Sequence, residues 1–352
     1  MPVVLLVYLA LVYWRFKLYQ KVEGRDMVCG KPMPYFFVLQ NDDFFPFAGV
    51  SVKMFSTFSY VEKMPEGVGY ELLPGDKYTY ETKLICRYRG EYEVGVKEII
   101  VTDFLRIFRF RYRINETIKA LVLPKVTHVT TLNSIGNLSV LSQREVFGAD
   151  KEPDVVVRDY MAGDALKQIQ WKATARAQKL KTRNRIGEEN QGIALLCDTE
   201  RYSQDMREYL PVENKLLEIL LALAIFLAEH NVEFNTFYGQ NGLIKRHVEG
   251  IRDFDDLYER VSKIVYSKDE DMLQTLTMLV ERGEIMHSKV VFAVLHEMTD
   301  KIMLLTTRLS EMGMIMILYV VTDKNIEEYI RQSNERRKII AIPVEAELEG
   351  RL

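Results

Sequence analysis

The chain has 352 residues, of which 48% are apolar and 28% are charged, and its formal net charge is −3. This composition is typical of a globular protein and excludes a collagen-like or largely disordered chain. One hydrophobic core rarely serves more than about 250–300 residues, so we expect two domains. The slightly negative charge argues against a dedicated nucleic-acid-binding protein. Cys29, Cys86 and Cys197 form no CxxC pair, so we predict buried thiols in a reducing compartment.

Residues 1–14 are an apolar run without charged side chains, and basic residues follow it at once. A helix of that length spans about 21 Å, short of a hydrocarbon core of about 30 Å, so a membrane span would have to continue through 15–20. The basic residues Arg15, Lys17, Lys21 and Arg25 favour keeping their side in the cytoplasm. We therefore predict a membrane anchor over 1–24, with soluble domains facing the cytoplasm. The alternatives are a buried helix and a signal peptide, and no small-residue cleavage site supports the latter.

Residues 25–126 contain short aromatic and β-branched runs with turn residues between them. Alternation with period 2 is clear in "YTYETKLICRYR" (78–89), and "LPGDK" (73–77) has Pro and Gly where a turn needs them. The pattern predicts an antiparallel β-sandwich. Arg109, Arg111 and Arg113 share one face of a predicted strand. That face is either a charged edge that discourages aggregation or a site for anionic lipid headgroups.

The segment 127–190 contains "VRDYMAGDALKQIQWKATARAQKL" (157–180), the densest run of specific chemistry in the chain. Gly163 permits a positive φ in a turn, Asp164 can cap a following helix, and Trp171 would pack inward. We interpret the segment as a connector that locks the domains together through buried Arg–carboxylate pairs. Eight Lys or Arg against two Asp in 158–185 leave open a second interpretation, a site for an acidic partner or lipid headgroups. The residues concerned are Arg158, Asp159, Gly163, Asp164, Trp171, Lys172 and Arg176.

From residue 191 to 352, strand patterns alternate with helical patterns. The apolar run "GIALLC" (192–197) is typical of a central parallel strand, and "KVVFAVL" (289–295) and "MIMILYVV" (314–321) are similar. We predict a doubly wound α/β domain of the Rossmann type, in which sites form beyond the carboxyl ends of the strands. These ends carry Asp198, Glu200, His296, Glu297 and Asp323.

The segment 157–176 resembles the domain-of-unknown-function 58 family. The matching residues are Val157, Arg158, Asp159, Tyr160, Gly163, Asp164, Ile169, Trp171, Lys172, Ala173 and Arg176. Upstream, "RGEYEVGVKEIIVTDFLRIF" (89–108) is similar to the family's Arg-Gly-x-Tyr strand and Asp-Pro-Phe-Gly-Leu-Phe turn, but "DFLRIF" lacks the Pro and the Gly. The resemblance implies a bacterial or archaeal membrane-associated protein with a von Willebrand factor A-like C-terminal domain. It also implies a partnership with a MoxR-type AAA+ ATPase.

In von Willebrand factor A domains, a divalent cation is held by an Asp-x-Ser-x-Ser motif, a distant Thr and a distant Asp. Here Asp198 is present, but Glu200 and Tyr202 occupy the serine positions, and His296 stands where the family has another ligand-bearing motif. We therefore expect a degenerate site that holds no metal, and no cofactor. Asp198, Glu200 and Glu297 remain the alternative cation-binding set.

The sequence contains no GxSxG, phosphate-loop, HExxH or CxxC motif. We therefore predict a membrane-anchored, non-enzymatic adaptor that works with a MoxR-type AAA+ ATPase in protein-complex assembly or cell-envelope processes. The alternative is a hydrolase-like enzyme at the carboxyl edge of the C-terminal sheet, for which only the carboxylates and His296 argue. We expect no nucleic-acid partner, because no recognition module or aromatic platform accompanies the basic residues.

Overall fold

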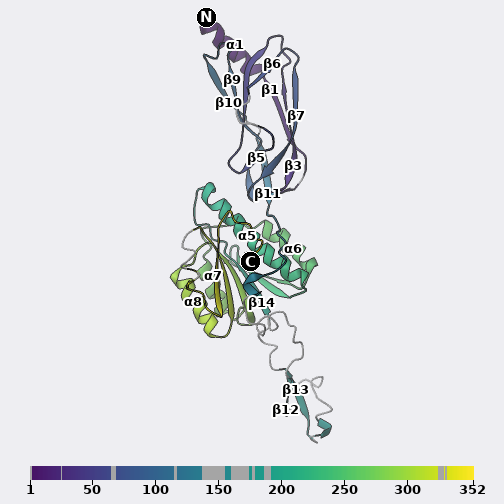
Figure 1. Cartoon of the computed structure of the whole chain (residues 1–352), viewed down its shortest axis with the longest axis vertical. Helices are drawn as coiled ribbons and strands as arrows, with labels where there is room; N and C mark the ends of the chain where they lie inside the picture. The colour runs from purple at the N-terminus through teal and green to yellow at the C-terminus, as the bar shows by residue number, and fades with distance from the viewer. Residues whose placement is uncertain are drawn as a thin grey trace. The chain divides into compact units, whose positions relative to one another are not determined.

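The computed structural model describes residues 2–24, 26–64, 69–114, 117–136, 155–159, 174–176, 179–185, 192–323, 329 and 331–352. The chain divides into two compact units, Met1–Lys125 and Val126–Leu352, whose elements are labelled in Figure 1. All three cysteines are buried and free, as their spacing predicted.

Antiparallel sheets make up most of the first unit. One sheet has the strand order β1 (Lys17–Val22), β3 (Pro32–Gln40), β7 (Lys77–Cys86) and β5 (Ser59–Val61). A second has the order β10 (Arg109–Arg113), β9 (Val96–Thr102), β4 (Phe47–Met54) and β6 (Gly69–Leu72). A third joins β2 (Met27–Val28), β11 (Ile118–Leu123) and β8 (Gly90–Val94), with β2 and β11 parallel. Alternate residues of β3, namely Tyr35, Phe37 and Leu39, are buried. In β7, where the sequence predicted alternation, burial alternates from Tyr80 to Leu84, but Leu84, Ile85 and Cys86 are then buried in succession.

Helix α1 (Pro2–Arg15) packs on this unit with one face and exposes the other. Leu5, Leu9 and Val12 are buried, whereas Val7 and Trp14 are 54% and 81% exposed. The hydroxyl of Tyr8 fixes the helix to the loop before β4, because it donates to the carbonyl of residue 46 and accepts from the N–H of residue 48. In the described part of the chain, no helix combines the length and the apolar character that a membrane crossing requires.

The predicted continuation of this helix through 15–20 is wrong, because the chain becomes strand β1 at Lys17. β1 pairs with β3 over its whole length, from Lys17 opposite Gln40 to Val22 opposite Tyr35. Main-chain groups that are bonded to a neighbouring strand cannot also extend a helix. The predicted anchor over 1–24 therefore contains a short helix and a strand of the antiparallel sheet.

A mostly parallel six-stranded sheet forms the centre of the second unit. Its order is β16 (Leu243–Val248), β15 (Phe234–Gly239), β14 (Gly192–Cys197), β17 (Ser288–Leu295), β18 (Ile315–Val321) and β19 (Arg337–Ile342), and β16 runs antiparallel to β15. The helices in the described part of this unit are α2 (Asn133–Gly136), α5 (Met206–Glu229), α6 (Ile251–Ser262), α7 (Met272–Glu281) and α8 (Asp300–Glu311). Strands β12 (Val155–Asp159) and β13 (Lys181–Arg185) form a separate antiparallel pair. The predicted alternation of strands and helices is confirmed from β14 to β18.

Helices pack on both faces of the six-stranded sheet, as the α5 and α6 side and the α7 and α8 side in Figure 1 show. Ile193 and Leu195 of β14 belong to the core with α5 and α6, and Ala194 and Leu196 belong to the core with α7 and α8. Burial on both faces explains why the central strands are continuously apolar. The parallel pairing of β14 with β17 brings their carboxyl ends together at one edge.

Candidate functional site

The candidate site lies where β14 and β17 end. These two strands are parallel neighbours in the centre of the sheet, with Cys197 opposite Val294. From β14 the chain continues through α5 to β15, and from β17 it continues through α8 to β18, on the other side of the sheet. The two connections therefore diverge, which is the arrangement that leaves a crevice at the carboxyl edge of such sheets. Asp198 and His296 are the first residues after the two strands.

Asp198 is a buried carboxylate whose two oxygens both have partners. Its Oδ1 accepts from the N–H of Glu200 at 3.0 Å, and its Oδ2 accepts from the N–H of His296 at 3.2 Å. The same Oδ2 lies 2.5 Å from the imidazole Nδ1 of His296. A carboxylate that is 1% exposed needs such donors, because burying a charge without them is costly. These contacts hold the ends of both strands to one side chain.

The His296 ring is fixed by two neighbours. It contacts Asp198 through Nδ1 and stacks on Tyr202, with ring centroids 5.6 Å apart and planes 13° apart. Tyr202 is itself held, because its hydroxyl donates to the carbonyl of Glu208. Burial lowers the pKa of His296, but the hydrogen bond and charge of Asp198, with the nearby carboxylates of Glu200 and Glu297, outweigh burial and raise it above its usual range.

Glu200 is the third member of the group. The loop that carries it is joined to Ser267 by a β-bridge, and the N–H of Met272, at the start of α7, bonds its carboxylate. Burial raises the pKa of Glu200, and the carboxylates of Asp198 and Asp271 raise it further against the opposing effect of His296. One ligand atom each from Asp198, Glu200 and His296 lies within 4.8 Å of the others.

The structure does not bring all of the predicted edge residues into this group. Glu297 is exposed and acts on His296 only through its charge. Asp323 is also exposed, and its Oδ1 accepts from the N–H of Val344, so it links the end of β18 to the segment after β19. Sequence reasoning did not predict that the start of α7 contributes to the site. The signal for this helix start is Asp271, which directly precedes the helical pattern of 272–281.

The predicted connector is described only in part. Arg158 and Asp159 lie in strand β12, with their main chains opposite Thr182 and Lys181 of β13. Arg176 is exposed. The other predicted motif residues, Gly163, Asp164, Trp171 and Lys172, lie outside the described residues. The interpretation as a domain-locking connector therefore stays a prediction.

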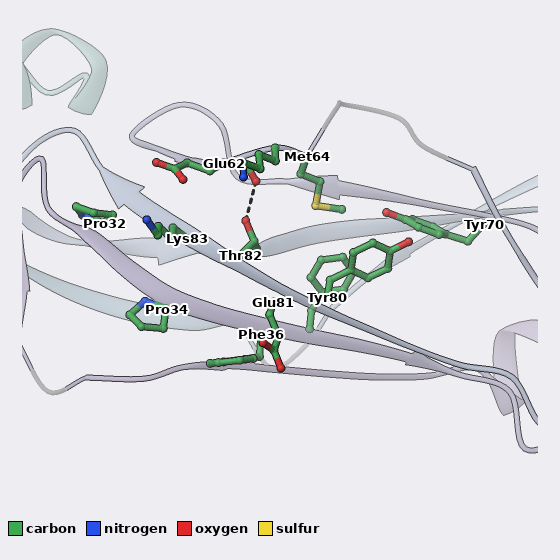
Figure 2. A pocket seen from close by; sticks show the side chains of 12 residues that line it. Pro32, Pro34, Phe36, Glu62, Met64, Tyr70, Tyr80, Glu81, Thr82 and Lys83 are labelled. Atoms are coloured by element: carbon green, nitrogen blue, oxygen red, sulfur yellow. Dashed lines mark hydrogen bonds between the residues drawn. The ribbon is translucent and has the colours of Figure 1, made fainter.

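The first unit has a hollow of about 630 Å³ on its β3–β7 face, which Figure 2 shows from close by. Tyr70 and Tyr80 lie side by side in it beneath Met64, and the Thr82 hydroxyl donates to the carbonyl of Glu62 at 2.6 Å. Tyr80 also stacks on Phe37, with ring centroids 4.7 Å apart. The hollow is therefore an aromatic surface, and nothing in the described residues shows what would occupy it.

The fold and the side-chain group define a protein with an antiparallel β unit and a mostly parallel α/β unit that carries an Asp–Glu–His cluster at its carboxyl edge. Residues 156–238 match the family described as "Protein of unknown function DUF58", a range that includes β13, β14, α5 and most of β15. The chain therefore contains a DUF58 family domain, as the 157–176 motif indicated.

No curated protein matches the chain. Among solved structures, a GH20 exo-β-N-acetylglucosaminidase from Vibrio harveyi, in complex with N-acetylglucosamine, is 9% identical over 94% of this chain and 82% of that chain, with a TM-score of 0.20. A Bacteroides uniformis β-glucuronidase is 10% identical over 88% of this chain and 34% of that chain, with a TM-score of 0.18. Similarities this low support no conclusion about fold or activity.

Proposed function

We propose that the protein is a non-enzymatic, membrane-associated adaptor. In this proposal its second unit is a von Willebrand factor A-like domain of the Rossmann type that contacts a MoxR-type AAA+ ATPase. The choice of partner rests on the family resemblance alone. The matched family is described as one of unknown function and names no partner. The process served would be protein-complex assembly or a cell-envelope process, with the soluble units on the cytoplasmic side.

The observation that carries the adaptor proposal is the set of contacts that Asp198 and His296 make. Asp198 holds the ends of β14 and β17 together, and His296 is held between Asp198 and Tyr202. In the described residues, no serine, threonine or cysteine side chain is hydrogen-bonded to His296, so the pair lacks the nucleophile of a catalytic triad. The exposed carboxylate of Glu297 beside this rigid pair suits a basic patch on a partner.

Membrane association has separate support in the first unit. The exposed face of α1 adjoins β10, and a hollow of about 650 Å³ there is lined by Val7, Leu11, Trp14, Phe110 and Arg111. Arg109 and Arg111 are exposed on β10. Apolar side chains next to arginines are what an interfacial contact with anionic lipid requires.

A pull-down tests the adaptor proposal. The full chain is mixed with the MoxR-type ATPase from the same genome, at low and high salt, with and without magnesium. We expect binding that weakens with salt, does not need magnesium, and is reduced when Glu200 and Glu297 are both changed to Lys. Glu297→Lys alone should also reduce binding. This variant leaves the Asp198 group intact, because Glu297 is exposed. Asp255→Lys, an equal change at an exposed position of α6, is the matched control.

Absence of binding at low salt, or binding that Glu297→Lys and Asp255→Lys reduce equally, would remove this edge from the proposal.

The second candidate function, a hydrolase-like enzyme, is favoured by one observation. Asp198 holds Nδ1 of His296, which is how a carboxylate orients a histidine that acts as a general base through Nε2. A hydrolytic activity of the purified chain that His296→Ala abolishes and His287→Ala retains would support this candidate instead.

A further inference from the structure

The magnesium site that the family resemblance implied does not fit the residues at this edge. Magnesium prefers six oxygen ligands in octahedral array. Tyr202 stands at a serine position, but its ring stacks on His296 and its hydroxyl donates to Glu208, so it is turned to other partners. His296 adds a nitrogen where an oxygen ligand would be expected. The residues have therefore lost the hydroxyls of a magnesium site and gained an imidazole.

We infer that Asp198, Glu200 and His296 form a binding site for a divalent transition metal of the zinc class. One imidazole nitrogen and two carboxylates are ligands that zinc, cobalt and similar ions accept, and imidazole favours such ions over magnesium. Three protein ligands leave at least one coordination position for water or for a group from a partner. The inference goes beyond the adaptor proposal and does not depend on it.

Charge balance is the first argument for a metal. Asp198 and Glu200 place two carboxylates within 4.8 Å of each other, and the first of them is buried. Two like charges at this distance disfavour the folded state unless one carboxyl is protonated or a cation lies near them. A single imidazolium from His296 balances one negative charge, whereas a divalent cation balances both. His296 therefore offsets only part of the repulsion between the carboxylates of Asp198 and Glu200.

Preorganisation is the second argument, since each ligand is held by contacts from outside the group. His296 is stacked on Tyr202, and the strand-end loop of Asp198 and Glu200 is joined to Ser267 through the N–H of Arg201 and the carbonyl of Thr199. Contacts of this kind orient ligands and strengthen metal binding. In a tetrahedral site with zinc–ligand bonds of about 2.0–2.2 Å, two ligand atoms lie about 3.3–3.6 Å apart, so Nδ1 and Oδ2, now 2.5 Å apart, must separate by about 1 Å. The metal then replaces the hydrogen that these two atoms share.

Cobalt(II) and zinc titrations test the inference on the full chain. The purified protein is stripped with a chelator, and cobalt(II) alone is added while the visible absorption is recorded. We expect one equivalent to bind with the intense bands of a low-coordinate site, zinc to displace it, and excess magnesium to leave it in place. His296→Gln and Asp198→Asn should abolish the bands. His287→Gln and His247→Gln, which alter exposed histidines of the same unit, should retain them.

Glu200→Gln keeps the inference testable if the buried Asp198 variant fails to fold. Glu200 is only half-buried, so this variant should have the circular dichroism of the wild type and weaker cobalt binding. Absence of a saturable cobalt signal in the wild type would overturn the inference. Binding that persists in His296→Gln and Glu200→Gln would also overturn it, because the ion would then be adventitious. Neither outcome depends on ATPase binding, so failure of the adaptor proposal is a separate result.

Discussion

The imidazole Nδ1 of His296 and the carboxylate Oδ2 of Asp198 lie 2.5 Å apart, although 98 positions separate the two residues in the chain. The contact exists because β14 and β17 are adjacent parallel strands that end at the same edge. It joins the two central strands of the sheet through the buried Asp198 and the largely buried His296. Its loss should therefore affect the stability of the second unit as well as any chemistry at the edge.

Asp198→Ala should lower the free energy of unfolding of the second unit by about 3 kcal/mol, because it leaves buried donors and the His296 ring without their partner. Urea unfolding followed by circular dichroism, with a chelator present, measures the change. Asp255→Ala, at an exposed position of α6, should change stability by less than about 0.5 kcal/mol. Equal effects of the two substitutions would show that the Asp198 contacts contribute little.

Asp103 should make the stability of the first unit depend on pH in the acidic range. This carboxylate is buried, and burial raises its pKa, but N–H donors of Phe108, Leu105, Ile107 and Arg106 lower the pKa below its usual value. A lowered folded-state pKa means that the stabilisation is complete above the unfolded-state pKa of about 3.9. The stabilisation is lost as the pH falls through the folded-state value.

Asp103→Asn removes this titration, so we expect it to destabilise the protein at neutral pH and to matter progressively less below about pH 4. Urea midpoints of wild type and variant, measured from neutral pH downward, check the convergence. Asp255→Asn, at an exposed position, is the matched control. A constant difference between wild type and Asp103→Asn at every pH would contradict the assignment.

Arg106→Gly should stabilise the turn that follows Asp103. Arg106 has a φ of 57°, in the left-handed region that disfavours residues with a Cβ atom. We expect the substitution to raise the free energy of unfolding by up to about 1 kcal/mol, reduced by the extra unfolded-state freedom of glycine. Arg109→Gly, within strand β10, should lower it instead. Thermal unfolding of both variants checks the difference in sign.

This turn shows what the sequence can and cannot predict. The family's Pro and Gly are missing from "DFLRIF", yet the Asp103 carboxylate accepts from the N–H groups of Leu105 and Phe108 and holds the turn. Side-chain hydrogen bonds thus replace the local conformational preference that sequence reasoning looks for. The same limit applies after Arg15, where the helix ends and the chain, from Lys17 on, pairs with β3, which is distant in sequence.

The parallel sheet was predictable because strands buried on both faces are continuously apolar, as in 192–197 and 315–321. The edge residues Asp198 and His296 followed from the strand ends. Their mutual contact did not, because it depends on which strands are neighbours. His296 therefore looked like the loss of a ligand, although it supplies a donor atom beside Asp198 and Glu200.

The last prediction concerns the exposed face of α1, which we expect to contact anionic membranes. Val7 and Trp14 are 54% and 81% exposed, while the opposite face of the helix is packed on the first unit, so both can be changed without disturbing the core. The protein should sediment with vesicles that contain anionic lipid, and Val7→Glu with Trp14→Glu should weaken this. Removing the two side chains from an apolar contact costs roughly 2–4 kcal/mol, which corresponds to more than about a tenfold loss of partition.

Tyr60→Glu, on strand β5, is the control because Tyr60 is also exposed but is not part of the α1 face. High salt should weaken sedimentation of the wild type, because the arginines of β10 lose their attraction to anionic headgroups. Neutral vesicles should therefore bind less protein than anionic ones. If the double variant and Tyr60→Glu sediment as the wild type does, α1 is not the membrane-contacting face, and the proposed membrane association loses its structural support.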